Sequence, residues 1–243
     1  MESSPAIPDF VPAELAQLQL ALSAEQLDRL ARYLHLLLET NKQFNLTGIK
    51  EPQAAWRRHI IDSLTLVPLL ADCPAGTTVI DVGSGGGLPG VPLAIARPDL
   101  RFTLLEATGK KARFLESCIR DVPLPNGTVL NDRAEKAGQT KGCRQHFDVA
   151  VCRAVGPLRE VLEYLLPLVK VGGQALAMKG AQAEAELEAA SDAMMILGAG
   201  ELQVIQAYPD GWPTEAVLIR LTKERPTPPE YPRLPGTPHQ DPL

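Results

Sequence analysis

The chain has 243 residues, of which 45% are hydrophobic, and its formal net charge is −5 at pH 7. This length suits one α/β domain with an additional segment, and the acidic balance argues weakly against nucleic-acid binding without excluding basic patches. The four cysteines are scattered, so we expect reduced structural thiols and no metal site. No signal peptide or apolar run of membrane-spanning length is visible, which predicts a cytoplasmic protein.

Residues 1–70 are predicted to form a small helical region. A short helix is expected at about 13–21, and Ser23 is a good N-cap for a second helix that ends near Asn41. Apolar residues recur every three or four positions along that second helix, as on one buried face. Pro52, a favoured first-turn residue, is expected to begin another helix that ends near Leu66.

From residue 71 to 222 the chain alternates between strand and helix patterns. Strands are predicted at 77–83, 101–106, 127–131, 147–152 and 173–179, and helices at 88–96, 109–121, 157–168 and 182–197. Such alternation predicts a parallel sheet with helices on both faces.

The last two predicted strands, Leu202–Tyr208 and Ala216–Leu221, are joined by too few residues for a crossover helix, so they must be antiparallel. The resulting mixed seven-stranded α/β sheet, ending in a hairpin, resembles class I S-adenosylmethionine (SAM) methyltransferases, which are Rossmann-like. A dinucleotide-binding fold would end in another crossover. The Pro-rich tail, residues 223–243, is expected to be extended without a packed core of its own.

A glycine-dense turn follows the first of these strands. Asp81, Gly83, Gly85 and Gly87 match the pattern D-x-G-x-G-x-G, while Gly85–Gly90 also matches the dinucleotide fingerprint G-x-G-x-x-G. Asp81 favours SAM, because a carboxylate there would repel a pyrophosphate but could serve the cationic amino-acid moiety of SAM.

Polar residues follow the next three strands. Glu106 stands where an acid accepts hydrogen bonds from ribose hydroxyls, which suits NAD and SAM alike. Ala134 and Glu135 follow the third strand, beside the expected adenine. Arg153 ends the fourth strand and faces the ligand crevice.

No Asn/Asp-Pro-Pro-Tyr/Phe motif follows the fourth strand, which argues against methylation of an exocyclic amine. A ring nitrogen such as guanine N7 has no proton to lose, so positioning would supply most of the rate. His59 is then expected to shape the site, by hydrogen bonding with Asp62 or Asn45, rather than to act as a base. Taken alone, Asn45 is better explained by the end of a helix, and Arg58 with Asp62 by a surface ion pair, than by a catalytic role.

A basic cluster, Lys110, Lys111 and Arg113, opens the helix after the second strand. Such a cluster could grip RNA phosphates or be ordinary solvated surface.

In combination, these motifs resemble the RsmG family, also called glucose-inhibited division protein B (GidB). The matching runs include Asn45-Leu46-Thr47, Arg58-His59 with Asp62-Ser63, Asp81 to Gly90, Gly109-Lys110-Lys111, Arg153-Ala154, Lys179-Gly180 and the tail run Tyr231-Pro232-Arg233. Members of this family are bacterial small-subunit rRNA guanine-N7 methyltransferases.

The resemblance implies SAM as cofactor, 16S rRNA or the small ribosomal subunit as partner, and a target guanine near the decoding region. It implies a cofactor site with Gly83, Leu88, Ala134, Glu135 and Arg153, and RNA contacts that include Arg233. A monomer without metal or membrane contact is expected. Two alternatives remain: an NAD(P)-dependent Rossmann oxidoreductase, and a SAM-binding ribosome-assembly factor that transfers no methyl group.

Overall fold

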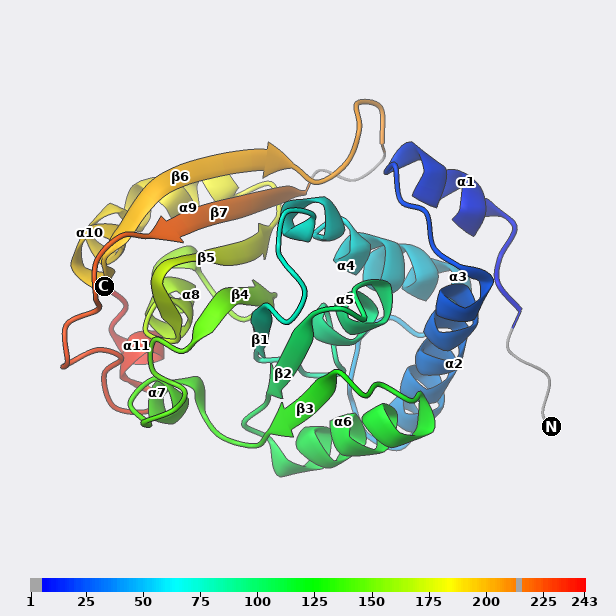
Figure 1. The fold of residues 1–243 in the computed structure, drawn as a ribbon, viewed down its shortest axis with the longest axis horizontal. Coiled ribbons are helices and arrows are strands. Elements are labelled where there is room, and N and C mark those ends of the chain that lie inside the picture. Colours follow the sequence, from blue (N-terminus) through cyan, green and yellow to red (C-terminus); the bar gives the residue numbers. More distant parts are fainter. Residues whose placement is uncertain (1–5, 213–215) are drawn as a thin grey trace.

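Seven strands form one mixed sheet through the middle of the molecule (Figure 1). They are β1 (Thr78–Val82), β2 (Arg101–Leu105), β3 (Gly127–Leu130), β4 (Phe147–Arg153), β5 (Val169–Lys179), β6 (Ala199–Gln206) and β7 (Val217–Lys223). In this computed structural model, which describes residues 6–212 and 216–243, the strand order is β3-β2-β1-β4-β5-β7-β6. Neighbouring strands from β3 to β5 are parallel, and β7 runs antiparallel to both β5 and β6. The predicted fold class and terminal hairpin are confirmed.

The order of the strands reverses at β1. The chain moves from β1 outward to β2 and β3, then returns to β4 on the other side of β1. Asp81 on β1 is level with Leu104 of β2 and Val151 of β4. A ligand crevice is therefore expected outside the carboxyl ends of β1 and β4.

Helices cover both faces of the sheet (Figure 1). They are α1 (Phe10–Gln17), α2 (Ala24–Asn41), α3 (Pro52–Ala55), the π-helical turn η1 (Trp56–Ile61), α4 (Asp62–Leu64), the 3-10 turn η2 (Val67–Leu70), α5 (Gly90–Ala96), α6 (Gly109–Asp121), α7 (Ala134–Ala137), α8 (Leu158–Leu165), α9 (Ala183–Ala189), α10 (Ser191–Leu197) and α11 (Thr237–Gln240). Two predictions are corrected in detail. The helix expected from Pro52 to Leu66 contains the π turn, and the helix expected at 182–197 is broken at Ala190.

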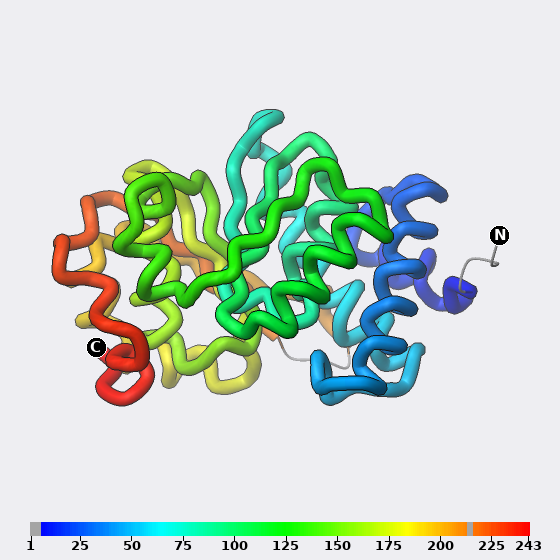
Figure 2. Tube along the Cα trace, turned by 90° about the horizontal axis from the view of Figure 1, so that it is seen from below, coloured from blue at the N-terminus to red at the C-terminus, as the bar shows by residue number. Residues whose placement is uncertain are grey.

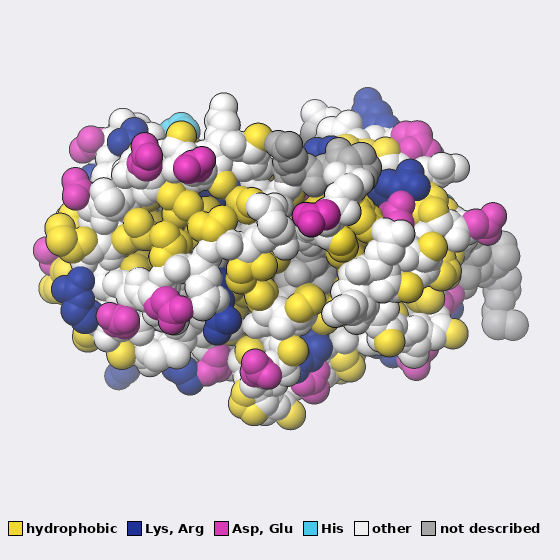
Figure 3. Space-filling view, turned by 90° about the horizontal axis from the view of Figure 1, so that it is seen from above, with side chains coloured by type: hydrophobic (Ala, Val, Ile, Leu, Met, Phe, Trp, Pro, Cys, Tyr) yellow, Lys and Arg dark blue, Asp and Glu magenta, His cyan; other side chains and the backbone are white. Residues whose placement is uncertain are grey.

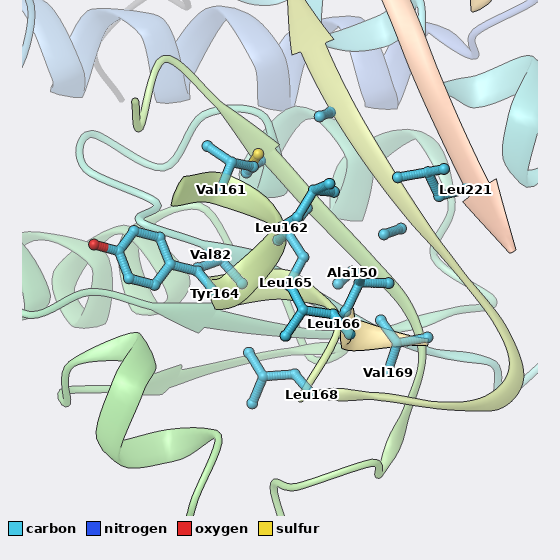
Figure 4. Packing of buried hydrophobic residues seen from close by; sticks show 14 of the residues in the cluster. Val82, Ala150, Val161, Leu162, Tyr164, Leu165, Leu166, Leu168, Val169 and Leu221 are labelled. Carbon is cyan, nitrogen blue, oxygen red and sulfur yellow. The ribbon is translucent and has the colours of Figure 1, made fainter. Parts of the chain in front are cut away.

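Successive residues of the central strands point to opposite faces, so each face has its own core. Ile80 and Ala150 pack on the side of α8, against Leu162 and its neighbours (Figure 4). Val79 and Val151 point to the other side, against Leu93 of α5 and Ile61. Burial on both faces explains why these strands are continuous apolar runs.

The N-terminal helices share a core with the sheet domain. The predicted cap Ser23 is confirmed as half of a capping box, because its hydroxyl accepts from Gln26 N at 3.2 Å and Gln26 Oε1 accepts from Ser23 N at 2.9 Å. The amide of Gln26 also donates to the carbonyls of Ile95 and Ala96 at the end of α5. Helix α2 is thereby fixed against the helix that follows the glycine loop.

The C-terminal tail is fastened to the domain, at the opposite end of the molecule from α2 (Figure 2). The Arg233 guanidinium contacts the carboxylate of Glu163, a fully buried residue of α8, at 2.6 and 2.9 Å. The side chain of Arg144 donates to four main-chain carbonyls, three of them in the tail. The tail, expected to be extended, instead packs closely against the domain through these contacts and contains α11. Arg233, expected to contact RNA, pairs with Glu163.

Strand β6 is an edge of the sheet and carries exposed apolar side chains. Leu202 is 39% and Val204 50% exposed. Apolar side chains also gather over this half of the molecule in the view from above (Figure 3). Among the helices of residues 6–212 and 216–243, none is long and apolar enough to cross a membrane.

We predict that Arg233→Ala lowers the free energy of unfolding by about 2–3 kcal/mol, because it leaves the buried Glu163 carboxylate without its cation. Urea unfolding followed by circular dichroism measures the loss. The double variant Arg233→Ala/Glu163→Gln is the control, and it should recover part of the stability because no buried charge is left. A single variant within about 0.5 kcal/mol of the parent contradicts the assignment.

Candidate cofactor and active site

Glycines shape the loop between β1 and α5. Gly83 and Gly85 have φ of +73° and +57°, a region that residues with a side chain rarely adopt. A Cβ at Gly83 would lie 3.0 Å from Val155 Cγ2, whereas one at Gly85 would meet only the Gly83 carbonyl oxygen, at 3.8 Å. The loop therefore leaves bare backbone facing open space at Gly85, as close approach of a ligand requires.

Asp81, expected to face a cationic group of the cofactor, is instead fully buried beneath the loop. Its Oδ2 accepts from the Ser84 hydroxyl at 2.7 Å and from Gly90 N, at the start of α5, at 2.9 Å. Burial raises the pKa of this carboxyl to about 6, against the opposing effect of these two hydrogen bonds. Asp81 braces the glycine loop from within.

Glu106 lies at the end of β2 and is tied to the glycine loop. Its Oε2 accepts from Gly85 N at 2.9 Å, and its Oε1 accepts from Thr108 N at 2.7 Å. Each carboxylate oxygen has two lone pairs, so both can accept a further hydrogen bond. The acid is therefore held in place and still able to bind a pair of ribose hydroxyls.

Leu88 and Gly87 belong to the packed underside of the same loop. Leu88 is 6% exposed and lies in the core that α2, α5 and α6 share. A Cβ at Gly87 would lie 2.7 Å from Val91 Cγ2. Tyr33 of α2 donates its hydroxyl hydrogen to Gly86 O at 2.8 Å. These residues support the loop from below rather than line its open side.

Ala134 and Glu135 begin α7, on the far side of Glu106. The Glu135 side chain, expected near adenine, is buried and already has two partners. Its Oε1 accepts from Arg133 at 3.0 Å and from Gly236 N of the tail at 2.8 Å, which together with backbone bonds lower its pKa despite burial. The half-buried Ala134 backbone is then the better candidate for contact with an adenine edge.

A cavity of about 560 Å³ lies beyond the ends of β4 and β5 and brings together most of the predicted catalytic residues. Arg153 donates to Asp62 Oδ2 at 3.0 Å and to Arg58 O at 2.9 Å. Besides Arg153 and Asp62, the charged or polar residues that line the cavity include Arg58, His59, Lys179 and Glu186. Four of the five predicted catalytic residues, namely Arg58, His59, Asp62 and Arg153, therefore meet at one cavity.

His59 is 6% exposed and hydrogen-bonded at both ring nitrogens. Nε2 lies 2.6 Å from Thr47 Oγ1, and Nδ1 lies 3.0 Å from Arg58 O and 3.3 Å from the Arg153 guanidinium. Burial, with Arg153 as the second cause, lowers the pKa of His59 to about 4. The imidazole is thus neutral at pH 7, and its partners are not the expected Asp62 and Asn45.

Asn45, the fifth predicted catalytic residue, is exposed and does not line this cavity. Its near neighbour Asn41 has the structural role. The Asn41 amide donates to Thr47 O at 2.9 Å and accepts from Leu46 N and Thr47 N. Asn41, at the end of α2, thereby places the Thr47 hydroxyl against His59.

Tyr208, just after β6, was not singled out from the sequence. Its hydroxyl donates to Asp62 Oδ1 at 2.8 Å, and burial followed by Asp62 raises the pKa of Tyr208 above its usual value. Asp62 therefore joins the hairpin to Arg153. Two aromatic residues, Tyr208 and Trp212, near the turn of the hairpin are the only signal in the sequence that could have indicated this contact.

The predicted basic cluster lies at the start of α6. Lys110 and Arg113 are exposed and Lys111 is half-buried. In the part of the chain that the structure describes, none of the three forms an ion pair within 4.0 Å.

Solved structures share this architecture. The S-adenosylmethionine-dependent methyltransferase SibL in its apo form is 16% identical with a TM-score of 0.55, over 88% of this chain and 74% of that one. TYW2 of M. jannaschii in complex with AdoMet is 15% identical with a TM-score of 0.51, over 68% and 76%. The sheet order and the glycine loop give this chain the fold of class I SAM-dependent methyltransferases, as in these solved structures.

Sequence relatives identify the family. The model of the rRNA small subunit methyltransferase G family (GidB) matches residues 26–210. "Ribosomal RNA small subunit methyltransferase G" of Moorella thermoacetica is 42% identical over 92% of this chain and 93% of its own. The protein of the same name from Lactiplantibacillus plantarum is 40% identical over 97% and 98%. The chain belongs to this family, as its motifs predict, and the oxidoreductase and non-catalytic alternatives are not favoured.

The residues present fit SAM. Bare backbone at Gly85 opens to solvent, and Glu106 beside it keeps acceptor capacity for ribose hydroxyls. No group of three or more His, Cys, Asp or Glu side chains that could hold a metal ion occurs among the described residues.

We predict that Glu106→Gln weakens SAM binding about tenfold, or roughly 1.4 kcal/mol. The amide keeps the shape, but its NH2 group faces a backbone N–H and its oxygen carries no charge. Isothermal titration calorimetry measures the affinity. Glu116→Gln, which removes an exposed acid from α6, is the matched control and should bind like the parent. Unchanged affinity in Glu106→Gln would show that this acid does not contact the ribose.

Proposed function

We propose that the protein transfers a methyl group from SAM to N7 of a guanine in 16S ribosomal RNA, near the decoding region, and acts in the cytoplasm as a monomer. The names of its relatives support ribosomal RNA as the substrate. One observation supports the ring nitrogen: among the described residues that line the 560 Å³ cavity, no side chain is placed to remove a proton from the substrate.

The candidate bases in that wall are all engaged. Asp62 pairs with Arg153 at 3.0 Å, and Glu186 pairs with Lys179 at 2.7 Å. His59 has partners at both ring nitrogens, and its pKa of about 4 makes it a weak base. Guanine N7 offers a lone pair and carries no proton, so the lack of a base does not prevent its methylation.

In this mechanism the protein contributes mainly positioning. Bound SAM supplies an electrophilic methyl group on a positively charged sulfur. Arg153 is fixed by Asp62 and by Arg58 O, and it forms a rigid wall of the cavity. The exposed Arg58 guanidinium is available for a phosphate beside the target base. Thr47 and His59 lock the loop that closes the cavity on the side of the N-terminal helices.

The cofactor would lie along the loop, with its ribose on Glu106 and its adenine beside Ala134. Gly83 and Gly85 give the close backbone approach. Asp81 and Glu135 would act indirectly, because Asp81 braces the loop and Glu135 joins α7 to the tail. The cluster of Lys110, Lys111 and Arg113 would bind RNA phosphates on the same side of the sheet.

The proposal is tested by incubating the protein with SAM labelled in the methyl group and with either 16S rRNA or small subunits. The modified base is then mapped by nuclease digestion and mass spectrometry. We expect one labelled 7-methylguanine. Label on another atom would overturn the N7 assignment, and no label on either RNA would overturn methyl transfer to this substrate.

We predict that the triple variant Lys110→Ala/Lys111→Ala/Arg113→Ala binds RNA more weakly at every sequence and leaves SAM affinity intact. Three lost phosphate contacts should flatten the slope of log affinity against log salt by about 2. Filter binding over a salt series measures that slope. The control is Arg29→Ala/Arg32→Ala/Lys42→Ala, which removes equal charge from cations that each pair with an acid on α2. Equal slopes for the first triple variant and the parent would show that Lys110, Lys111 and Arg113 do not contact RNA phosphates.

We predict that the single-turnover rate, with saturating SAM and RNA, is nearly flat from about pH 6.5 to 8.5. His59 has a pKa of about 4, so it stays neutral throughout this range. His59→Gln should keep measurable activity, since no proton transfer is lost. Rapid quench at each pH gives the rate. A tenfold rise per pH unit that His59→Gln abolishes would establish a working base and contradict the N7 assignment.

A further inference from the structure

A second hollow lies beside the methyl-transfer cavity and has no part in the cofactor site. We call it the hairpin hollow. It has a volume of about 710 Å³ and is lined mainly by Glu14, Arg57, Arg58, Tyr208, Asp210 and Trp212. Its lining includes residues of α1 and of the segment 208–212 that follows β6. Figure 1 shows α1 beside this end of β6. Its volume is within the range of sites that take small molecules.

An aromatic platform forms one wall of the hairpin hollow. Tyr208 and Trp212 are stacked, with ring centroids 5.0 Å apart and 18° between the ring planes. Tyr208 is buried, but Trp212 is only half-buried, so the indole presents aromatic surface to the hollow. An aromatic ring with accessible surface is the usual support for an unpaired nucleobase.

Two arginines, Arg57 and Arg58, also line the hairpin hollow. Arg57 donates from Nε to Glu14 Oε1 at 2.7 Å, and its guanidinium carbon lies 3.7 Å above the Phe10 ring. Arg58 lines both the hairpin hollow and the methyl-transfer cavity. If one nucleotide occupies the hairpin hollow and the next occupies the methyl-transfer cavity, Arg58 could contact the phosphate between them.

The polar lining matches a base better than a phosphate alone. Three carboxylates, those of Glu14, Glu51 and Asp210, face the same hollow as the two arginines. This mixture of donors and acceptors suits the edge of a base, which itself presents both hydrogen-bond donors and acceptors.

The two hollows are also joined mechanically. The Tyr208 hydroxyl, at the base of the platform, donates to Asp62, and Asp62 pairs with Arg153 in the wall of the methyl-transfer cavity. A base stacked on the platform would therefore act, through the Tyr208 hydroxyl, on the same Asp62 carboxylate that orients Arg153.

We propose that the hairpin hollow binds one unpaired nucleobase of the RNA, adjacent to the methylated guanine, by stacking it on Trp212 with Arg58 on the intervening phosphate. The inference rests on the proposed function for the identity of the RNA. The hairpin hollow would give the enzyme a second base contact, by which it recognises that the nucleotide next to its target is unpaired.

Tryptophan fluorescence tests base binding directly, without methyl transfer. Trp56, the other tryptophan, is 3% exposed, so quenching by a bound base reports Trp212. The probes are a short unpaired oligoribonucleotide and the same backbone with abasic sites in place of the bases. We expect the intact oligomer to quench and the abasic oligomer, which keeps every phosphate, to quench far less. Equal quenching overturns the proposal, because phosphate contacts would then account for binding.

Kinetics test the contribution to catalysis. Trp212→Ala should raise the KM for RNA about fivefold or more, since the base loses its stacking partner, while the KM for SAM stays near that of the parent. Trp212→Phe keeps an aromatic ring and should restore the KM for RNA to within about twofold. A KM for RNA in Trp212→Ala that equals the parent value overturns the proposal. A parent that labels no rRNA would refute the proposed function instead, and the fluorescence comparison alone then decides whether the hollow binds a base.

Discussion

The buried carboxylate of Asp81 is the constraint on which the cofactor site depends. One of its oxygens accepts from both Ser84 and Gly90 N, so it fixes the first turn of the glycine loop and the start of α5 together. The fit is close, because a Cβ at Gly90 would lie 2.6 Å from that oxygen. A side chain at position 90 would therefore clash with the Asp81 carboxylate, so this buried acid requires glycine there. The open face of the loop at Gly85 is a consequence of this internal bracing.

A chain of side-chain contacts joins elements that are distant in sequence into one active site. Thr47, held by Asn41 at the end of α2, contacts His59, and His59 in turn contacts Arg153 of β4. The chain continues through Asp62 to the hairpin. The N-terminal helices are therefore a wall of the catalytic cavity, and we expect their truncation to impair the chemistry as well as the fold.

The features that could be predicted from the sequence are those that a local pattern of residues determines. Apolar runs that end in acids located β1 and β2, and a connection too short for a crossover required the antiparallel hairpin. Glu106 could be predicted because a parallel strand delivers its last residue to the crevice. Contacts between distant segments carry no such signal: Arg233 meets Glu163 across 70 residues and Tyr208 meets Asp62 across 146. The run Asn45-Leu46-Thr47 indicated Asn45, but the structural role falls to Asn41, whose side chain contacts Leu46 and Thr47.

Two buried groups also give the site opposing dependences on pH. The pKa of His59 falls from 6.5 to about 4 on folding, so the unfolded chain binds the extra proton and stability is lost as pH falls through this window. The pKa of Asp81 rises from 3.8 to about 6, so its contribution is fully present below 3.8 and is lost as pH rises through 6. Between about pH 4 and 6 the two largely cancel. At neutral pH the neutral imidazole of His59 costs no stability. The charged Asp81 is retained there at a cost in stability, while its Oδ2 accepts from both Ser84 and Gly90 N.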